Sequence, residues 1–153
     1  MDADLGLANL DIILNLNPKA TLHDVIMKNR NLDDVILAGP QGLHILPAAS
    51  GKKEYTHLTQ DLQEGLLEVV SDLCLKYDYL FLDIGAGISE VVLHRASLAE
   101  ETLIVATPAP TSLTDAYATI KVLASLQNRS SFYLVANQVQ DEASGQWVSN
   151  NLQ

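Results

Sequence analysis

Four short apolar runs with strand character alternate with longer helical patterns, and this alternation restricts the fold more than any other feature. The runs are 43–47, 79–83, 102–107 and 132–137. Three of them are almost continuously hydrophobic, which is typical of strands covered on both faces, as in a parallel sheet. The sequence therefore predicts an α/β fold with a mostly parallel sheet flanked by helices. Ligands bind such sheets beyond the carboxyl ends of the strands.

The segments between these runs have the periodicity of helices. Apolar residues recur at spacings of three and four in 58–76 and again in 112–127, which predicts helices that pack on a core. The second of these patterns starts with a capping-box-like sequence, and Cys74 in the first is expected to be a buried small hydrophobe. Further helix starts or weaker helical patterns are predicted at Thr21–Asp24, Asn31–Asp34, 89–99 and 144–152.

Composition narrows the class of protein. The chain has 153 residues, of which 48% are apolar, and this is enough for one domain with a hydrophobic core. The formal net charge of −10 argues against a general basic surface for nucleic acid, although a local nucleotide pocket stays compatible with it. A single cysteine excludes a disulfide scaffold and fits a reducing compartment. No apolar run approaches the roughly 20 residues of a membrane span, and the acidic start is unlike a secretory leader, so we expect a cytoplasmic protein.

The end of the second run carries the strongest chemical pattern. Several apolar residues are followed by Asp83, and then by Gly85 and Gly87. A carboxylate at a strand end can hold a magnesium-bound water beside nucleotide phosphates, which is the form of a Walker B element. An ordinary Asp-containing turn explains the carboxylate alone somewhat better, but the two glycines favour a close approach of the backbone to a ligand.

Two other strand ends offer weaker candidates. Asp2 and Asp4 could position a water and a metal, although an acidic helix N-terminus explains that segment alone better. Asn137 could bind a base edge through its amide, but such an Asn more often caps a turn. The four histidines have no ligand spacing, and Lys52–Lys53 after Gly51 is better explained as a solvated loop.

Taken together, the segments resemble a known family. The matching stretches are DADLGLANLD, GLHILPAASG, YDYLFLDIGAGIS, TPAPTSLTDAYATIK and LVANQV, and they occur in this order over nearly the whole chain. They resemble the MinD/ParA-type deviant-Walker ATPases, and within these the FlhG/FleN group of flagellar number and placement regulators. The resemblance implies a partial Rossmann-like P-loop NTPase fold that binds ATP with Mg²⁺, forms a face-to-face dimer with ATP, and is reset by slow hydrolysis.

The resemblance also implies roles for individual residues. Asp4 matches the carboxylate that orients the attacking water. Asp2 and Asp83 match groups that act on Mg²⁺ through bound water. Gly85 and Gly87 match the loop that senses the γ-phosphate. These assignments follow from matching positions in the family pattern, and they predict a catalytic Asp4 beside a magnesium site.

Two further positions are matched outside the acidic cluster. Asn137 matches the Asn that contacts adenine, and Asp115 with its helix lies where the dimer and partner surface is expected. In the family, partners besides a second copy include a signal-recognition-type GTPase, flagellar switch proteins and a transcriptional regulator. No motif in this chain selects among them, and no direct nucleic-acid contact or membrane helix is expected.

The sequence departs from the family pattern in two large respects and one small one. A Gly-rich phosphate loop of the GKGGVGKT kind is not present, and neither are the family's last strands and membrane-binding helix. Ala109 stands where many relatives carry Glu. We therefore expect 1–153 to be a single incomplete domain with little or no ATP turnover. The alternatives are a non-catalytic interaction module and another MinD/ParA-type positioning ATPase.

The missing phosphate-loop strand has a structural consequence in this interpretation. Its absence is expected to leave a gap between the strands that end at Asp83 and Thr107. Unpaired strand edges are a liability in solution. We expect the chain either to be marginal, swapped or aggregation-prone, or to close the two strands together directly.

Overall fold

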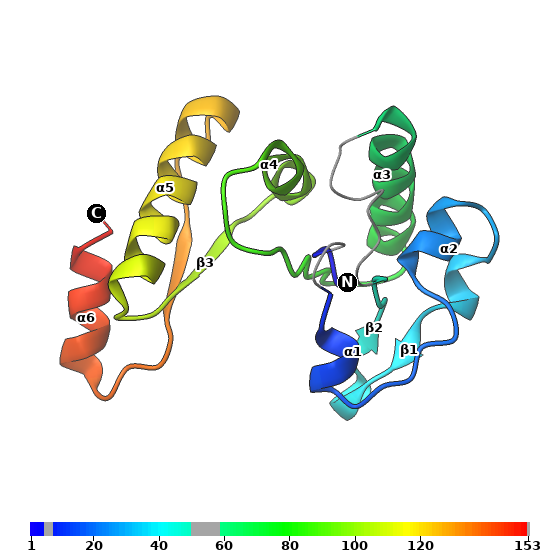
Figure 1. Cartoon of the computed structure of the whole chain (residues 1–153), viewed down its shortest axis with the longest axis horizontal. Coiled ribbons are helices and arrows are strands. Elements are labelled where there is room, and N and C mark those ends of the chain that lie inside the picture. Colours follow the sequence, from blue (N-terminus) through cyan, green and yellow to red (C-terminus); the bar gives the residue numbers. More distant parts are fainter. Residues whose placement is uncertain (5–7, 50–58, 153) are drawn as a thin grey trace. The chain divides into compact units, whose positions relative to one another are not determined.

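A computed structural model of the chain describes residues 1–4, 8–49 and 59–152 (Figure 1). These residues divide into two compact units, Met1–Gly85 and Ala86–Gln153. Each unit has its own helices and its own paired strands. Gly51, Lys52 and Lys53 lie outside the described residues.

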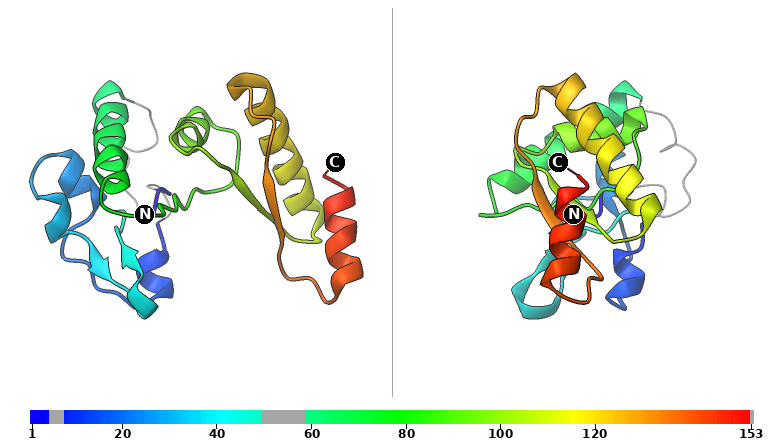
Figure 2. Two further views of the ribbon diagram at one scale, coloured as in Figure 1. Left: turned by 180° about the vertical axis from the view of Figure 1, so that it is seen from behind. Right: turned by 90° about the vertical axis from the view of Figure 1, so that its left-hand side faces the viewer.

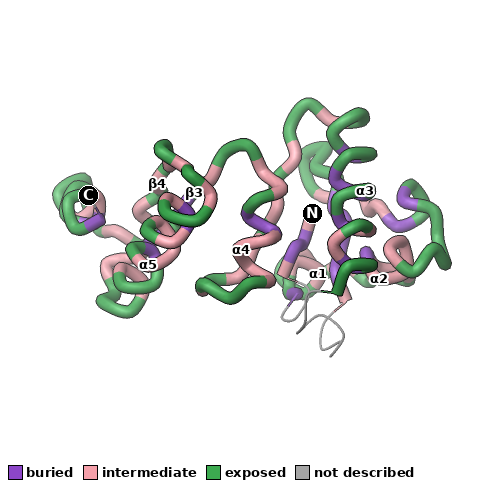
Figure 3. Tube along the Cα trace, turned by 90° about the horizontal axis from the view of Figure 1, so that it is seen from above, coloured by how far each residue is buried: buried purple, intermediate pink, exposed green. Residues whose placement is uncertain are grey.

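The first unit is built around one long helix. Helix α3 (Gln60–Cys74) buries one apolar stripe at the predicted spacing, seen as the purple positions along α3 in Figure 3: Leu62, Leu66, Val69, Val70 and Leu73. Helix α2 (Leu22–Ile26) packs against α3. The two helices approach closely at Gly65, where a Cβ atom would lie 2.8 Å from Cγ2 of Ile26. The predicted helix over 58–76 is confirmed for the part that is described.

Local capping explains where the shorter elements of this unit begin. Helix α2 starts with a capping box, in which the Thr21 N–H donates to Oδ2 of Asp24 at 2.8 Å. The remaining elements are α1 (Leu10–Ile13), the 3₁₀ helices η1 (Leu32–Asp34) and η2 (Pro40–Gly42), and strands β1 (Leu37–Ala38) and β2 (His44–Ile45). The expectation that Cys74 is buried is wrong, because Cys74 is exposed. It lies one position after the buried Leu73, and therefore outside the buried stripe of α3.

The predicted strands of the first unit form only in part. The run 43–47 contributes β2, which pairs antiparallel with β1 instead of parallel. The run 79–83 forms no strand, and its ladder contact is a single parallel bridge between Asp83 and Asp2. Among the described residues, those at 1–3 form hydrogen bonds with Phe81 and Asp83 of this run and with none before them. Tyr79 and Phe81 are 85% and 72% exposed.

The second unit contains the parallel sheet that the sequence predicts. Strands β3 (Leu103–Ala106) and β4 (Tyr133–Ala136) pair in parallel from Leu103↔Tyr133 to Ala106↔Ala136. Helix α5 (Pro110–Gln127) connects them, as parallel strands require. Helix α5 packs against β3 and helix α6 (Glu142–Asn150) packs against β4 (Figure 2). Within the described part of the chain, no helix has the length and apolar character needed to cross a membrane.

Only one face of this sheet is covered by packed side chains. Its core consists of Ile104, Ala106, Ala116, Val148 and Leu152. We call the opposite face, made of the exposed residues Leu103, Val105, Tyr133 and Val135, the open sheet face. The continuous apolar runs predicted coverage on both faces, and this is not what the described residues show.

The helices of the second unit begin close to the predicted positions. Helix α4 (Glu90–Ser97) is capped by Ser89, as the weaker pattern predicted. Helix α5 begins two residues before Ser112, because Pro110 occupies its first turn. The Ser112 hydroxyl instead accepts the N–H of Thr107 at 3.0 Å and ties the helix to the end of β3. Helix α6 is capped by Asp141, whose carboxylate accepts the N–H of Ser144 at 2.8 Å.

Candidate functional site

The first unit brings together the acidic residues of its two candidate segments through backbone pairing. The N–H of Asp83 donates to the carbonyl oxygen of Met1 at 2.9 Å, and the N–H of Ala3 donates to the carbonyl oxygen of Asp83 at 2.8 Å. On the other side, the N–H of Asp2 donates to the carbonyl oxygen of Leu46 at 3.0 Å. Residues 1–3 are thus hydrogen-bonded to two segments that are far away in the sequence.

The three carboxylates differ in their exposure. Asp2 is 2% exposed, Asp83 is exposed, and Asp4 is half-buried. Burial raises the pKa of the Asp2 carboxyl, and hydrogen bonds from the N–H groups of Leu10 and Asp4 oppose this effect. Asp83 is therefore the member of the set whose side chain solvent and ions reach most freely.

Asp4 and Gly85 approach each other closely. A Cβ atom at position 85 would lie 2.5 Å from Oδ2 and 3.0 Å from Cγ of Asp4. Glycine leaves room for the carboxylate in this orientation, and a larger residue would require the carboxylate to move. The structure thus places four of the predicted site residues, Asp2, Asp4, Asp83 and Gly85, on neighbouring segments of one unit.

The remaining predicted residues belong to the second unit. Gly87 has φ of 120°, a backbone region that favours glycine. Asn137 follows β4, where its N–H donates to the carbonyl oxygen of Ala106 at 2.7 Å and its Oδ1 accepts the N–H of Gln138 at 2.9 Å. Asp115 is exposed on α5. Among the described residues of this unit, no hydrogen bond joins Gly87, Asn137 or Asp115 to another of the three.

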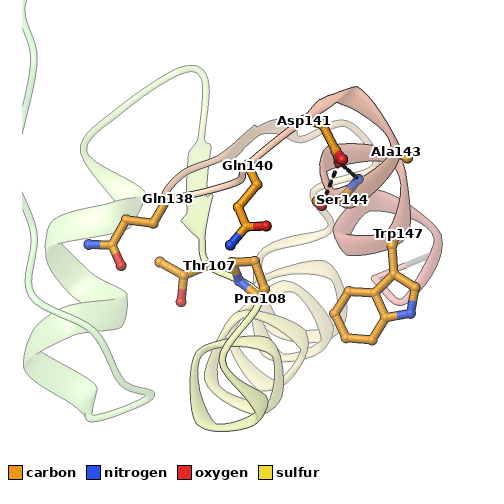
Figure 4. A pocket seen from close by; sticks show the side chains of 8 residues that line it. All are labelled: Thr107, Pro108, Gln138, Gln140, Asp141, Ala143, Ser144 and Trp147. Carbon is orange, nitrogen blue, oxygen red and sulfur yellow. Dashed lines mark hydrogen bonds between the residues drawn. The ribbon is translucent and has the colours of Figure 1, made fainter.

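An open groove of about 580 Å³ lies at the carboxyl ends of β3 and β4, and sequence reasoning missed it. Figure 4 shows Trp147 on one flank, with the Gln140 side chain directed toward Pro108. The eight residues that line it are Thr107, Pro108, Gln138, Gln140, Asp141, Ala143, Ser144 and Trp147. The signal available in the sequence was the position of Thr107 directly after β3 and of Gln138 two residues after β4.

Magnesium and ATP are implied by the family resemblance, and the described residues fit a metal ion held through water. Mg²⁺ usually keeps several waters and uses one or two carboxylates. No group of three or more acidic, His or Cys side chains that could hold a metal directly occurs among the described residues. The exposed Asp83 carboxylate is the group that a metal-bound water can reach.

Comparison with known proteins extends these observations. No family model matches the chain. The chain is 43% identical over 145 residues to the antiactivator FleN of Pseudomonas aeruginosa, covering 95% of this chain and 52% of FleN. It is 31% identical over 146 residues to the flagellum site-determining protein YlxH of Helicobacter pylori, covering 94% of this chain and 48% of YlxH. The chain therefore spans about half the length of these curated relatives.

Solved structures agree with the sequence relatives. The MinC:MinD cell division complex of Aquifex aeolicus contains a chain that matches with a TM-score of 0.74 and 27% identity, covering 91% of this chain and 55% of that one. A ParA family ATPase from Chlorobium tepidum matches with a TM-score of 0.76 at 19% identity, covering 99% of this chain and 65% of that one, which supports the fold alone. The predicted partial α/β Rossmann-like fold is confirmed. The chain is therefore similar, over nearly its whole length, to the MinD/ParA-type family and within it to the FlhG/FleN group.

Proposed function

We propose that this chain is part of a cytoplasmic MinD-like ATPase that sets the number or placement of flagella through ATP-dependent dimerisation and Mg²⁺-dependent hydrolysis. Two relatives that match about 95% of the chain support this proposal: YlxH, which is named a flagellum site-determining protein, and the antiactivator FleN. The structural observation that carries it is the close approach of Asp4 to Gly85, two residues beyond Asp83. These are the positions that the family pattern assigns to hydrolysis and phosphate sensing.

The proposed roles follow from exposure and donor chemistry. The half-buried Asp4 carboxylate accepts a hydrogen bond from a water and orients it for attack. The exposed Asp83 carboxylate would hold a magnesium ion through a bound water, and the ion would supply positive charge beside the phosphates. Gly87 lets the following loop approach the γ-phosphate, and Asn137 contacts the adenine base. In this proposal 1–153 is a single incomplete domain, and a segment outside 1–153 supplies its phosphate-binding loop.

The partner surface is proposed to lie on α5, around the exposed Asp115 and Tyr117. A second copy, a signal-recognition-type GTPase, flagellar switch proteins and a transcriptional regulator are the candidates. The description of the Pseudomonas relative as an antiactivator favours a transcriptional regulator among them. The exposed α5 surface also favours the second candidate function, an interaction module without ATP turnover.

Calorimetric titration with Mg-ATP tests whether the chain binds nucleotide without a phosphate loop of its own. Because the backbone N–H groups and lysine of a phosphate loop supply most of the contacts to the phosphates, we expect little or no binding and no measurable hydrolysis. Micromolar binding would overturn this expectation and make the chain an ATP-binding protein in its own right.

Asp4→Ala in the chromosomal gene of the source organism tests the flagellar role. We expect altered flagellar number or placement in electron micrographs, with Gly145→Ala on α6 as the control, since a Cβ there makes only an ordinary contact with Ala136 at 3.9 Å. Unchanged flagella with displaced division septa would support a different MinD-type positioning role and contradict the flagellar one.

A further inference from the structure

The carboxylate of Asp2 is turned into its own segment. Its Oδ1 accepts the N–H of Asp4 at 3.1 Å, and its Oδ2 accepts the N–H of Leu10 at 3.4 Å. Both oxygens are therefore occupied by backbone donors. With 2% of the residue exposed, water and ions have almost no access to this carboxylate.

Asp83 has the opposite arrangement. It is held through its backbone N–H and carbonyl oxygen, both paired with residues 1–3, while the residue itself is exposed. Asp2 and Asp83 face each other in one parallel bridge, so they occupy equivalent places on adjacent segments. Two carboxylates in equivalent backbone positions thus have different environments, which points to different tasks.

Two contacts restrict the conformation of Asp4. Its backbone N–H is held by Oδ1 of Asp2, and its carboxylate lies against the backbone of Gly85. The first contact fixes the peptide from which the side chain projects, and the second limits the directions in which the carboxylate can turn. Leu10, held by the other oxygen of Asp2, begins helix α1.

We propose that Asp2 is a positioning residue, which fixes the peptide of Asp4 and the start of α1, instead of holding a metal-bound water. This inference rests on the proposed function, because it assigns Asp2 a task through Asp4. The three carboxylates then have different tasks. The buried Asp2 orders the backbone, the half-buried Asp4 is held in one orientation, and the exposed Asp83 is left for the magnesium ion.

Amide hydrogen exchange of the full chain tests the proposal without any nucleotide. In Asp2→Ala we expect the Asp4 and Leu10 amides to exchange about tenfold faster than in the unsubstituted chain, as loss of one hydrogen bond predicts. Asp2→Asn should restore protection at one of the two amides, because its side-chain oxygen still accepts one bond and its NH₂ group cannot. Val69 on α3 serves as the reference for global unfolding.

A second readout concerns the orientation of Asp4 itself. Three-bond couplings report its χ1 rotamer, which we expect to be single in the unsubstituted chain and averaged in Asp2→Ala. Asp83→Asn is the matched control, because it removes the exposed carboxylate and should change neither the exchange rates nor the rotamer. If Asp2→Ala does not fold, rapid exchange of Asp4 and Leu10 in the unsubstituted chain overturns the proposal, and slow exchange together with a single rotamer supports it.

Two further outcomes would also contradict the proposal. Equal acceleration at Val69, Asp4 and Leu10 would mean that Asp2 holds the fold in general. Unchanged exchange in Asp2→Ala would mean that its carboxylate does not bind these amides. Neither outcome depends on ATP, so the inference can fail while the flagellar phenotype of Asp4→Ala still supports the proposed function.

Discussion

Oδ2 of Asp4 lies 2.5 Å from the place that a Cβ atom would occupy at Gly85. Real Cβ atoms do not approach an oxygen so closely, so the two residues depend on each other: a side chain at 85 requires the Asp4 carboxylate to move. The pair joins the two sequence segments to which the family pattern assigns hydrolysis and phosphate sensing. A larger residue at 85 therefore changes the orientation of the Asp4 carboxylate, whether or not a ligand is bound.

Gly85→Ala should displace the Asp4 carboxylate and lower the free energy of unfolding by about 1–3 kcal/mol, the usual cost of overpacking. The same change in an Asp4→Ala background should cost much less, because the clashing atoms are gone. Chemical denaturation of the four proteins measures this coupling. Gly145→Ala on α6 is the control and should be neutral or stabilising, since a helix-interior glycine costs about 1 kcal/mol relative to alanine. Equal costs of Gly85→Ala in both backgrounds would contradict the interpretation.

Arg129 binds the carboxyl-terminal end of α4, and we expect its replacement to lower the stability of the second unit. Its guanidinium donates to the carbonyl oxygens of Ala96, Ala99 and Glu100. These carbonyls lie at or beyond the last turn of the helix, where intrahelical partners run out. Arg129→Ala should lower the free energy of unfolding of the second unit by about 2 kcal/mol, within the range for hydrogen bonds to charged groups.

Arg129→Lys separates the charge of this side chain from its geometry. An ammonium cannot reproduce the fork of a guanidinium, so lysine should recover only part of the lost stability. Exposed Arg30 in the first unit is the matched control, and its replacement by Ala should change stability by less than about 0.5 kcal/mol. Full recovery with lysine would contradict a role for the forked geometry.

The sequence correctly predicted the helices and strands that depend on local periodicity. Its predictions were wrong where the structure depends on pairing between segments that are distant in the sequence. The stripe of α3 and the parallel strands β3 and β4 were correctly located, because burial repeats at the helix and strand periods. The run 79–83 has the same apolar character, yet it forms no strand, because a strand needs a partner along its length. Cys74 was misplaced because one residue of helical rotation separates it from the buried Leu73.

The candidate site likewise has features that the sequence indicated and features that it could not predict. The pattern of Asp83, Gly85 and Gly87 indicated a site at the end of an apolar run. The inward direction of Asp2 could not be predicted, because it depends on the N–H of Leu10, eight residues away. The groove beside Trp147 likewise depends on how α6 packs against β4, which no local pattern encodes.

His94 on α4 predicts a dependence of stability on pH. Burial, and secondarily the charge of Arg95, lower the pKa of the His94 imidazole below its ordinary value of 6.5. The unfolded chain therefore binds a proton at a higher pH than the folded chain does. The free energy of unfolding should fall as the pH decreases from 6.5 to the pKa of the folded state, and His94 should contribute no further change below it.

Replacement by a residue that does not titrate tests this prediction. His94→Gln should reduce the slope of the unfolding free energy in this pH range, and NMR titration of the His94 ring should give a pKa below 6.5. An unchanged slope, or a ring pKa above that value, would contradict the assignment.

The open sheet face predicts how the chain behaves in solution. Leu103 and Val105 on β3 are 50% and 57% exposed, and they continue across the sheet to Tyr133 and Val135 on β4. Contiguous apolar surface of this kind is buried when molecules associate. Sedimentation velocity should therefore show an average mass that rises with concentration.

Leu103→Thr combined with Val105→Thr should reduce this rise, because threonine keeps the β-propensity of the strand and removes apolar area. Leu126→Thr is the matched control, since Leu126 is 71% exposed on α5, away from this face, and its replacement should leave the concentration dependence unchanged. A monodisperse monomer at all concentrations, with one cooperative unfolding transition, would show that the open sheet face does not drive association.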